Sequence, residues 1–263
     1  LFNTTPCIVH GNGSPRAKIF FNRVCDYVSC NRLGHFLYNP VKERKLSEDY
    51  SISIFAFIDN FKEVNSFILG LAHLSYPKDK VSIYICSERE NLPSSCTDVL
   101  NKFKSFKFKK SEIGPRQLDE ALEYSNKMGD DYTLLIKSNA IINNPYVLNN
   151  LIKSNKGIIA PVMSIPNQLY ANFWRGVDDN GWYEEFQDYF KIVKNEDKGV
   201  WNCPHISDIV LMKKDSVKKC LGKFSLNYTQ EKGDFMTFCF NLRNSGDFVY
   251  ADNREKYGYL VSE

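Results

Sequence analysis

The chain has 263 residues, of which 43% are hydrophobic and 25% charged, and its formal net charge is +3. This composition is typical of a globular protein with a sizeable core, and so small a net charge gives no support for a nucleic-acid-binding surface. No stretch reaches the roughly 18 apolar residues of a membrane-spanning helix, so we expect no transmembrane segment.

Eight cysteines and three N-glycosylation sequons bear on the cellular compartment. The sequons begin at Asn3, Asn12 and Asn227. Cys86 and Cys96 flank a polar Pro/Ser turn, and this spacing favours a short disulfide loop. Because an even cysteine count combined with sequons is typical of oxidising compartments, we expect the secretory pathway.

The first fifty residues differ in pattern from the rest of the chain. In residues 1–28 we expect a short strand followed by a glycine turn, His10-Gly-Asn-Gly-Ser, whose backbone N–H groups could approach an anion. An ordinary turn is the more frequent role of such a sequence. Residues 29–50 have mixed polarity, a proline and a charge cluster, which indicate a linker. Since the chain begins with Leu1, we expect it to be a piece of a longer or processed protein.

From residue 51 onward, strand and helix patterns alternate. The expected strands are 51–58, 81–86, 106–109, 132–136 and 158–162. The expected helices are 62–74, 97–103, 115–129 and one that starts at Asn144-Pro145. This alternation predicts an α/β fold, with a mostly parallel sheet, helices on both faces and a Rossmann-like arrangement.

The second half is less regular, and we expect it to be partly antiparallel. Short strands are expected at 171–174, 182–183, 199–202 and 206–213, with a helix-like segment at 188–194. A helix at 234–244 and a last strand at 248–250 precede a tail at 257–260. We expect residues 51–263 to form one domain.

The strand at 132–136 ends in Lys137-Ser138-Asn139. In open α/β sheets, ligands bind at the carboxyl ends of the strands, so this tip is the expected place for a metal or nucleotide. Hard cations prefer oxygen anions, and the tip carries no carboxylate.

Other candidate groups have plain structural interpretations. No nucleophile triad or zinc-protease spacing is present, and packing is the favoured role of His73 and His205. The acidic residues between 178 and 188 are interpreted as a solvated face. Either a sugar-stacking platform or buried aromatic packing would account for three tryptophans: Trp174, Trp182 and Trp201.

One run of motifs is specific enough to indicate a family. The segments IIAPVMS, LYANFWRG, GWYEEFQDYFKIV and KGVWNCPHIS follow one another between Ile158 and Ser207, and FMTFC at 235–239 and residues 248–253 follow downstream. This order resembles that of procollagen lysyl hydroxylases. Residues 51–263 look like the accessory glycosyltransferase-like domain of that family, which implies a GT-A-type fold, and residues 1–28 look like the end of the preceding glycosyltransferase domain. The related collagen galactosyltransferases share APM, NFW and a YGY tail and are the nearest competitor.

The resemblance implies a metal and nucleotide-sugar site in residues 1–28. In the family's catalytic glycosyltransferase domain, the His of His-Gly-Asn-Gly is a metal ligand and its neighbours contact the diphosphate. By position, this implies His10 as a metal ligand and Asn12, Gly13 and Arg16 as cofactor-binding residues. Arg16 stands where the family has Lys.

A second implied site is the strand tip, which looks degenerate. Family members carry Asp-x-Asp at this position, where this chain has Lys137 and Asn139. A later acidic position of the family is occupied here by Asp234 alone. The resemblance therefore implies a degenerate metal and nucleotide site that does not support catalysis.

The implied parent is a collagen-modifying enzyme of the endoplasmic reticulum lumen, with Fe²⁺, 2-oxoglutarate and ascorbate for lysine hydroxylation and, in some members, Mn²⁺ with a UDP-sugar. For this domain alone we expect no cofactor and a non-catalytic accessory role. The implied partners are procollagen and the adjacent domains of the parent. A second copy of the chain, forming a homodimer, is a further possible partner. The alternatives are an active UDP-galactose-dependent collagen hydroxylysine galactosyltransferase and a glycan-binding module.

Overall fold

A computed structural model describes residues 44–46, 49–59, 61–90, 92, 97 and 99–262. Its centre is an eight-stranded sheet in the order β10-β13-β6-β12-β4-β1-β2-β3. These strands are β1 (Ile52–Ile58), β2 (Val81–Ser87), β3 (Ser105–Lys110), β4 (Tyr132–Lys137), β6 (Ile158–Pro161), β10 (Val200–Cys203), β12 (Ile209–Lys213) and β13 (Val249–Asp252).

The two halves of the sheet differ in direction. Strands β4, β1, β2 and β3 are all parallel, each to its neighbour. In the second half β12 runs antiparallel to both β4 and β6, β13 runs parallel to β6, and β10 runs antiparallel to β13. The prediction of a mostly parallel sheet with a partly antiparallel second half is therefore confirmed.

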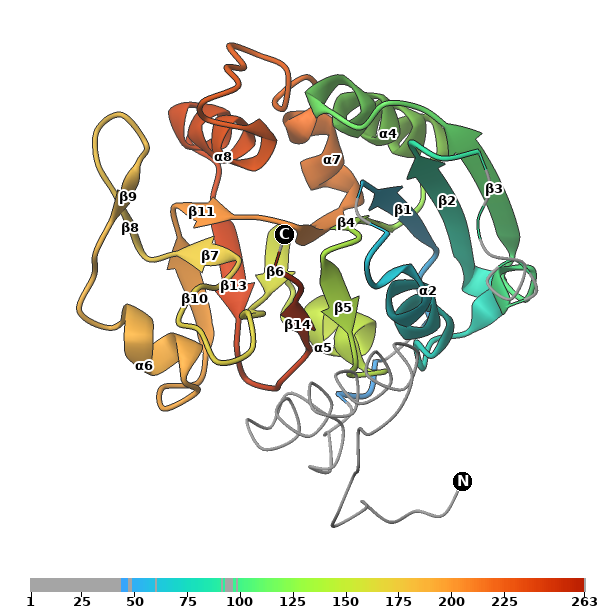
Figure 1. Ribbon diagram of the computed structural model, residues 1–263, viewed down its shortest axis with the longest axis horizontal. Helices are drawn as coiled ribbons and strands as arrows, with labels where there is room; N and C mark the ends of the chain where they lie inside the picture. Colours follow the sequence, from blue (N-terminus) through green and yellow to red (C-terminus); the bar gives the residue numbers. More distant parts are fainter. Residues whose placement is uncertain are drawn as a thin grey trace, which may run out of the picture.

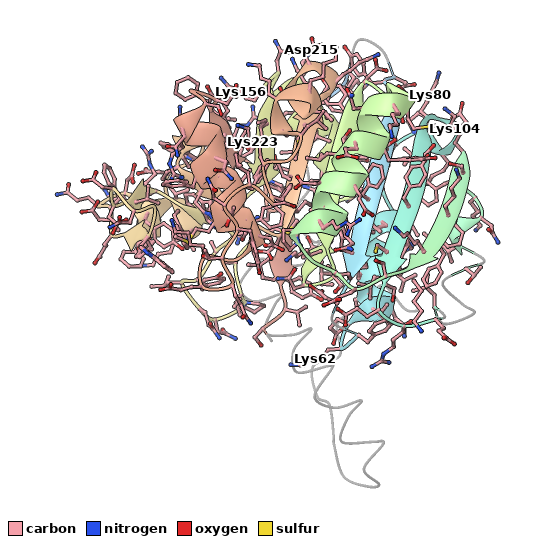
Figure 2. The ribbon with its side chains drawn as sticks, turned by 90° about the horizontal axis from the view of Figure 1, so that it is seen from above. Lys62, Lys80, Lys104, Lys156, Asp215 and Lys223 are labelled. Atoms are coloured by element: carbon pink, nitrogen blue, oxygen red, sulfur yellow. The ribbon has the colours of Figure 1, made fainter. Side chains whose placement is uncertain are left out.

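Helices cover both faces of the sheet, as the alternation predicted. In Figure 1, α2 (Val64–Ala72) and α5 (Val147–Lys153) lie below the sheet. The helices α4 (Pro115–Met128), α7 (Lys214–Cys220) and α8 (Asp234–Asn244) lie above it, and in Figure 2 α4 crosses in front of the strands. Two further elements with described bounds are a short 3₁₀ turn, η1 (Lys78–Lys80), and helix α6 (Tyr189–Val193).

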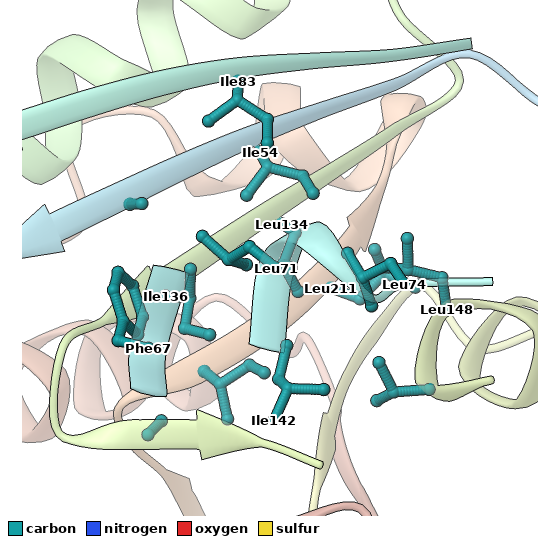
Figure 3. Close-up of a cluster of buried hydrophobic side chains, with 14 of the residues drawn as sticks. Ile54, Phe67, Leu71, Leu74, Ile83, Leu134, Ile136, Ile142, Leu148 and Leu211 are labelled. Carbon is teal, nitrogen blue, oxygen red and sulfur yellow. The ribbon is translucent and has the colours of Figure 1, made fainter. Parts of the chain in front are cut away.

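Strand β1 shows how the sequence fills the two cores. Successive side chains of a strand point to opposite faces. Ile54 and Ile58 accordingly belong to the core beneath the sheet, whereas Phe55 and Phe57 belong to the core above it. Figure 3 shows the lower core, where Leu71 of α2 packs below the sheet strands. All seven residues of β1 are buried, which is expected of a parallel strand covered on both faces.

Short strands complete the fold outside the main sheet. They pair as β11 (His205–Ile206) with β7 (Phe173–Trp174), β8 (Gly176–Val177) with β9 (Tyr183–Glu184), and β14 (Gly258–Leu260) with β5 (Ala140–Ile142). No helix among the described residues is long and apolar enough to span a bilayer.

One expectation about an element was wrong, and some elements were not expected. Residues 257–260 are not a tail, because β14 pairs antiparallel with β5. That pairing needs a glycine, since a Cβ on Gly258 would lie 2.0 Å from the carbonyl oxygen of Ile141. Helix α7 was not predicted, because only Val217 and Cys220 of its seven residues are buried. The helix expected at 97–103 falls partly outside the described residues.

Candidate functional site

The tip of β4 lies in the middle of the sheet, between the end of β1 and the segment that leads into β12. The amide of Lys137 donates to the carbonyl oxygen of Asp208 at 2.7 Å, and the amide of Ser138 donates to that of Phe57 at 2.8 Å. The carboxyl ends of the parallel strands β1 and β4 therefore meet here, at the place where such sheets bind ligands.

Lys137 forms an ion pair with the first residue of α8. Its Nζ lies 2.6 Å from Oδ2 of Asp234, and the two side chains are only 17% and 18% exposed. The other carboxylate oxygen, Oδ1, accepts the amide hydrogen of Phe235 at 2.7 Å. The ring of Phe235 also lies 5.6 Å from Nζ. Both oxygens of Asp234 are thus engaged within the chain.

The charge of Lys137 is stabilised although the residue is largely buried. Burial is the largest single influence and lowers the pKa of Lys137, but the carboxylates of Asp234, Asp59 and Asp208 together outweigh it, with Asp234 contributing most. The net effect raises the pKa of Lys137 above its usual 10.5. The tip therefore holds a permanent positive charge at neutral pH.

Two further carboxylates approach the tip from other segments. Ser138 Oγ donates to Asp59 Oδ1 at 2.8 Å, and Asn139 Nδ2 donates to Asp208 Oδ1 at 2.8 Å. Burial raises the pKa of Asp208 although the hydrogen bonds from Ser207 and Asn139 oppose the shift. Sequence reasoning found Asp234 but missed Asp59 and Asp208, which follow β1 and precede β12.

This donor set does not fit a divalent cation as it stands. Each of the three carboxylates is held by a donor of the tip, and one of those donors is an ammonium group. One oxygen, Asn139 Oδ1, is buried without a hydrogen-bond partner among the described residues. Within the part of the chain that the structure describes, no group of three or more His, Cys, Asp or Glu side chains is arranged to hold a metal ion.

Several predicted site residues lie outside the described residues and stay predictions: His10, Asn12, Gly13, Arg16, Asn3 and Cys96. Cys86 lies half-buried near the end of β2, and its pairing with Cys96 stays a prediction too. Asn227 lies exposed in a turn after α7, where its φ is 55°. Its glycosylation also remains a prediction.

His205 lies in the core of the second half. Its ring stacks on Trp174 with 3.9 Å between the centroids. Burial lowers the pKa of His205 to about 3, and the nearby Arg243 acts in the same direction. The imidazole is therefore neutral at physiological pH, which agrees with a packing role.

The three tryptophans are placed differently from one another. Trp174 stacks on His205, and Trp201 Nε1 donates to Asn253 Oδ1 at 2.9 Å. Trp182 lies exposed between β8 and β9. The ring contacts of the described residues include none between two of these indoles, so we find no support for a three-tryptophan platform.

Sequence comparison identifies the family. Residues 115–263 match the family described as glycosyltransferase family 25, N-terminal domain. A multifunctional procollagen lysine hydroxylase and glycosyltransferase of Caenorhabditis elegans is 31% identical, over 99% of this chain and 37% of its own length. Procollagen-lysine,2-oxoglutarate 5-dioxygenase 1 of Gallus gallus is 28% identical, over 100% of this chain and 38% of its own length. The chain thus spans less than two-fifths of these relatives.

Comparison with solved structures supports the fold. GalNAc-T7, solved with UDP, GalNAc and Mn²⁺, aligns with a TM-score of 0.61 and 11% identity over 97% of this chain and 56% of that chain. Residues 1–349 of TarS from S. aureus align with a TM-score of 0.51 and 14% identity over 80% of this chain and 60% of that chain. Both share the GT-A architecture, so the predicted fold class is confirmed. The chain belongs to glycosyltransferase family 25, and its relatives over the full chain are procollagen lysyl hydroxylases.

Proposed function

We propose that this chain is part of a collagen-modifying lysyl hydroxylase. Residues 51–263 would serve as a non-catalytic, glycosyltransferase-like accessory domain that supports the hydroxylation and glycosylation of procollagen lysines. The observation that carries this proposal is the ion pair between Lys137 and Asp234 at the tip of β4.

The physical argument rests on charge. In a metal-dependent transferase of this fold, a divalent cation neutralises the leaving diphosphate and orients it. A cation placed about 4 Å from the Lys137 ammonium would be repelled by about 8 kcal/mol at an effective dielectric constant of 20. Because the pKa of Lys137 is raised, the side chain does not lose its proton at neutral pH, and the repulsion of the cation persists. The tip thus disfavours the ion that the reaction would need.

The length and names of the relatives support the wider proposal. Since the chain spans 37–38% of the first relatives, the remainder leaves ample room for a dioxygenase domain with Fe²⁺, 2-oxoglutarate and ascorbate. Procollagen as the proposed substrate supports a secretory-pathway location for the parent, and we propose the endoplasmic reticulum lumen. A Mn²⁺ and UDP-sugar site would belong to the domain that precedes residue 29, with His10 as a ligand.

Calorimetry tests the accessory role directly. The 263-residue chain is titrated with Mn²⁺ and with UDP-galactose or UDP-glucose, beside Asp234→Asn and the matched control Asp215→Asn, an aspartate in the first turn of α7. We expect any metal-dependent binding to be the same in all three proteins. Tight metal-dependent binding that is lost only in Asp234→Asn would overturn the proposal.

An active, metal-independent collagen galactosyltransferase is the second candidate. The observation in its favour is that Lys137 supplies a permanent positive charge at the expected diphosphate position. It requires that the ion pair with Asp234 open, so that Nζ can contact the diphosphate. UDP release from UDP-galactose with collagen peptides, abolished by Lys137→Ala, would establish this candidate in place of the first.

A further inference from the structure

The β8–β9 hairpin projects from the side of the molecule opposite to β3 (Figure 1). Its turn is ordered by Asp178, whose Oδ1 accepts the amide hydrogens of Asn180 at 2.9 Å and Trp182 at 2.8 Å. Gly181 adopts a φ of 89°, which other residues rarely tolerate. The hairpin therefore presents its side chains from a defined backbone.

Large apolar side chains are concentrated on and beside this hairpin. Five of the ten exposed large hydrophobic side chains in the described part of the chain lie between residues 169 and 186. Four of them are aromatic, with exposed fractions of 52% for Tyr170, 37% for Trp182, 44% for Tyr183 and 50% for Phe186. Exposed apolar side chains that are grouped in this way often mark an interaction surface, whereas singly scattered ones need no explanation.

The buried Tyr189 contacts both the hairpin and the segment that carries Tyr170. Its hydroxyl donates to the carbonyl oxygen of Leu169 at 3.1 Å and accepts the amide hydrogen of Ala171 at 3.2 Å. Its ring lies 6.0 Å from that of Tyr183. Burial raises the pKa of Tyr189 to about 12, so the hydroxyl keeps its proton. The segment with Tyr170 is thereby fixed beside the hairpin.

The same stretch of sequence is strongly acidic. Residues 175–188 contain five carboxylates and one arginine, a net charge of −4 in a chain whose total is +3. The arginine is already engaged, because Arg175 Nε donates to Asp188 Oδ2 at 3.0 Å and Nη1 donates to the carbonyl oxygen of Asn202 at 2.8 Å. Its guanidinium also lies 5.4 Å from the ring of Phe186. The exposed Asp179, Glu184 and Glu185 are left to face a partner.

We propose that this projecting hairpin and the segment fixed beside it bind an extended, proline-rich polypeptide that carries lysine side chains. The exposed groups of this surface, which lie on both faces of the hairpin, are Tyr170, Trp182, Tyr183, Phe186, Asp179, Glu184 and Glu185. Aromatic side chains receive polyproline II segments, which are already ordered before binding. The ring faces attract ammonium groups, and the carboxylates complement their charge. The inference rests on the proposed function for the source of that polypeptide, since collagen chains are polyproline II helices with the Gly-X-Y repeat.

Peptide titration tests the surface. The probe is a single-chain peptide of Gly-Pro-Pro triplets with guest Gly-Pro-Lys triplets, too short to form a triple helix. It is titrated into the 263-residue chain and followed by calorimetry and tryptophan fluorescence. We expect saturable binding that weakens as salt screens the charges, over a Debye length of about 10 Å at 0.1 M. Each of two double variants, Trp182→Ala with Tyr183→Ala and Glu184→Lys with Glu185→Lys, should lose about tenfold or more in affinity.

Matched controls separate the surface from general effects. Glu123→Lys changes an exposed carboxylate on α4, and Phe248→Ala removes an exposed aromatic ring before β13. Both should bind the peptide like the unsubstituted chain, and circular dichroism should show all variants folded. Binding retained by both double variants would overturn the proposal, as would equal affinity for a peptide with Gly-Pro-Glu guests.

Other occupants would be recognised in the same experiment. A free oligosaccharide that displaces the peptide would assign the surface to glycans, and a dimer lost in the double variants would assign it to a second copy; either result overturns the proposal. None of these arms touches the tip of β4. Failure of the accessory role, seen as metal-dependent UDP-sugar binding that is lost only in Asp234→Asn, is therefore distinguishable from failure of peptide binding.

Discussion

The carboxylates at the tip of β4 are hydrogen-bonded within the chain, whereas several of those on the β8–β9 hairpin are exposed. At the tip, Asp59, Asp208 and Asp234 each accept a hydrogen bond from a side chain of Lys137-Ser138-Asn139. On the hairpin, Glu184 and its neighbours face solvent. Charge that is satisfied internally supports the fold, whereas charge left at the surface is available to a partner. Four experiments probe this difference.

Removing the ammonium at the tip should have the largest effect on stability. Lys137→Ala leaves the carboxylate of Asp234 largely buried without its partner, and breaking such a pair destabilises a protein by about 3 kcal/mol. Urea unfolding at pH 7 measures the difference from the unsubstituted chain. A loss below about 0.5 kcal/mol, as for a surface pair, would show that the ion pair contributes little.

Restoring carboxylates should convert the tip into a cation site. In the double variant Lys137→Asp with Asn139→Asp, the ammonium is gone and two acidic side chains join Asp208 and Asp234. Mn²⁺ at 100 times its Kd should then stabilise the variant by about 2.7 kcal/mol.

Thermal unfolding with and without Mn²⁺ checks this prediction. The matched control is Asn139→Asp alone, which keeps Lys137 and should show no Mn²⁺ effect. An equal response of both variants would mean that the ammonium is not what excludes the cation.

Acid should destabilise the packing at the base of the hairpin. The folded-state pKa of His205 is lowered to about 3, whereas an unfolded chain titrates near 6.5. The unfolded state therefore binds more protons between these values, so the stability present above pH 6.5 is lost as the pH falls.

The loss should be about 1.6 kcal/mol between pH 6.5 and pH 5, because the slope rises from half of its limiting value at pH 6.5 toward about 1.4 kcal/mol per pH unit. Urea unfolding of the unsubstituted chain and of His205→Gln across this range measures it. The substituted protein should show a correspondingly flatter pH profile. Parallel profiles would mean that His205 titrates normally in the folded chain.

Neutralising the hairpin should have the smallest effect on the fold. Glu184→Ala with Glu185→Ala removes exposed carboxylates, and such surface changes alter stability by less than about 0.5 kcal/mol. Urea unfolding should therefore overlay that of the unsubstituted chain. A larger loss would show that these side chains support the fold and would weaken the contrast with the tip.

Much of the fold followed from local sequence patterns. The β-branched strands and the helical spacing of apolar residues predicted β1, β2, β4 and α4 to within a few residues. Those patterns are informative because each element buries one or both of its faces against its neighbours. Its apolar residues therefore recur with the period of a helix or of a strand. Helix α7 escaped because it buries only Val217 and Cys220.

The candidate site was predictable only in part, because it depends on sheet order. Lys137 and Asn139 were recognisable as the end of a buried strand. Asp208 meets them because β12 inserts antiparallel between β4 and β6, and no local pattern reveals that insertion. Asp59 follows a strand that is distant in sequence but adjacent in space, so its contact with Ser138 also appears only in three dimensions.

The two glycines around β5 have a consequence for how this domain tolerates sequence change. A Cβ on Gly70 would lie 2.5 Å from the carbonyl oxygen of Ile142, and one on Gly258 would lie 2.0 Å from that of Ile141. Close backbone contacts with Gly70 and Gly258 thus fix the position of β5, which begins directly after Lys137-Ser138-Asn139. A methyl group on either glycine would push β5 away from α2 or β14, and Lys137-Ser138-Asn139, which joins β4 to β5, would be displaced with it.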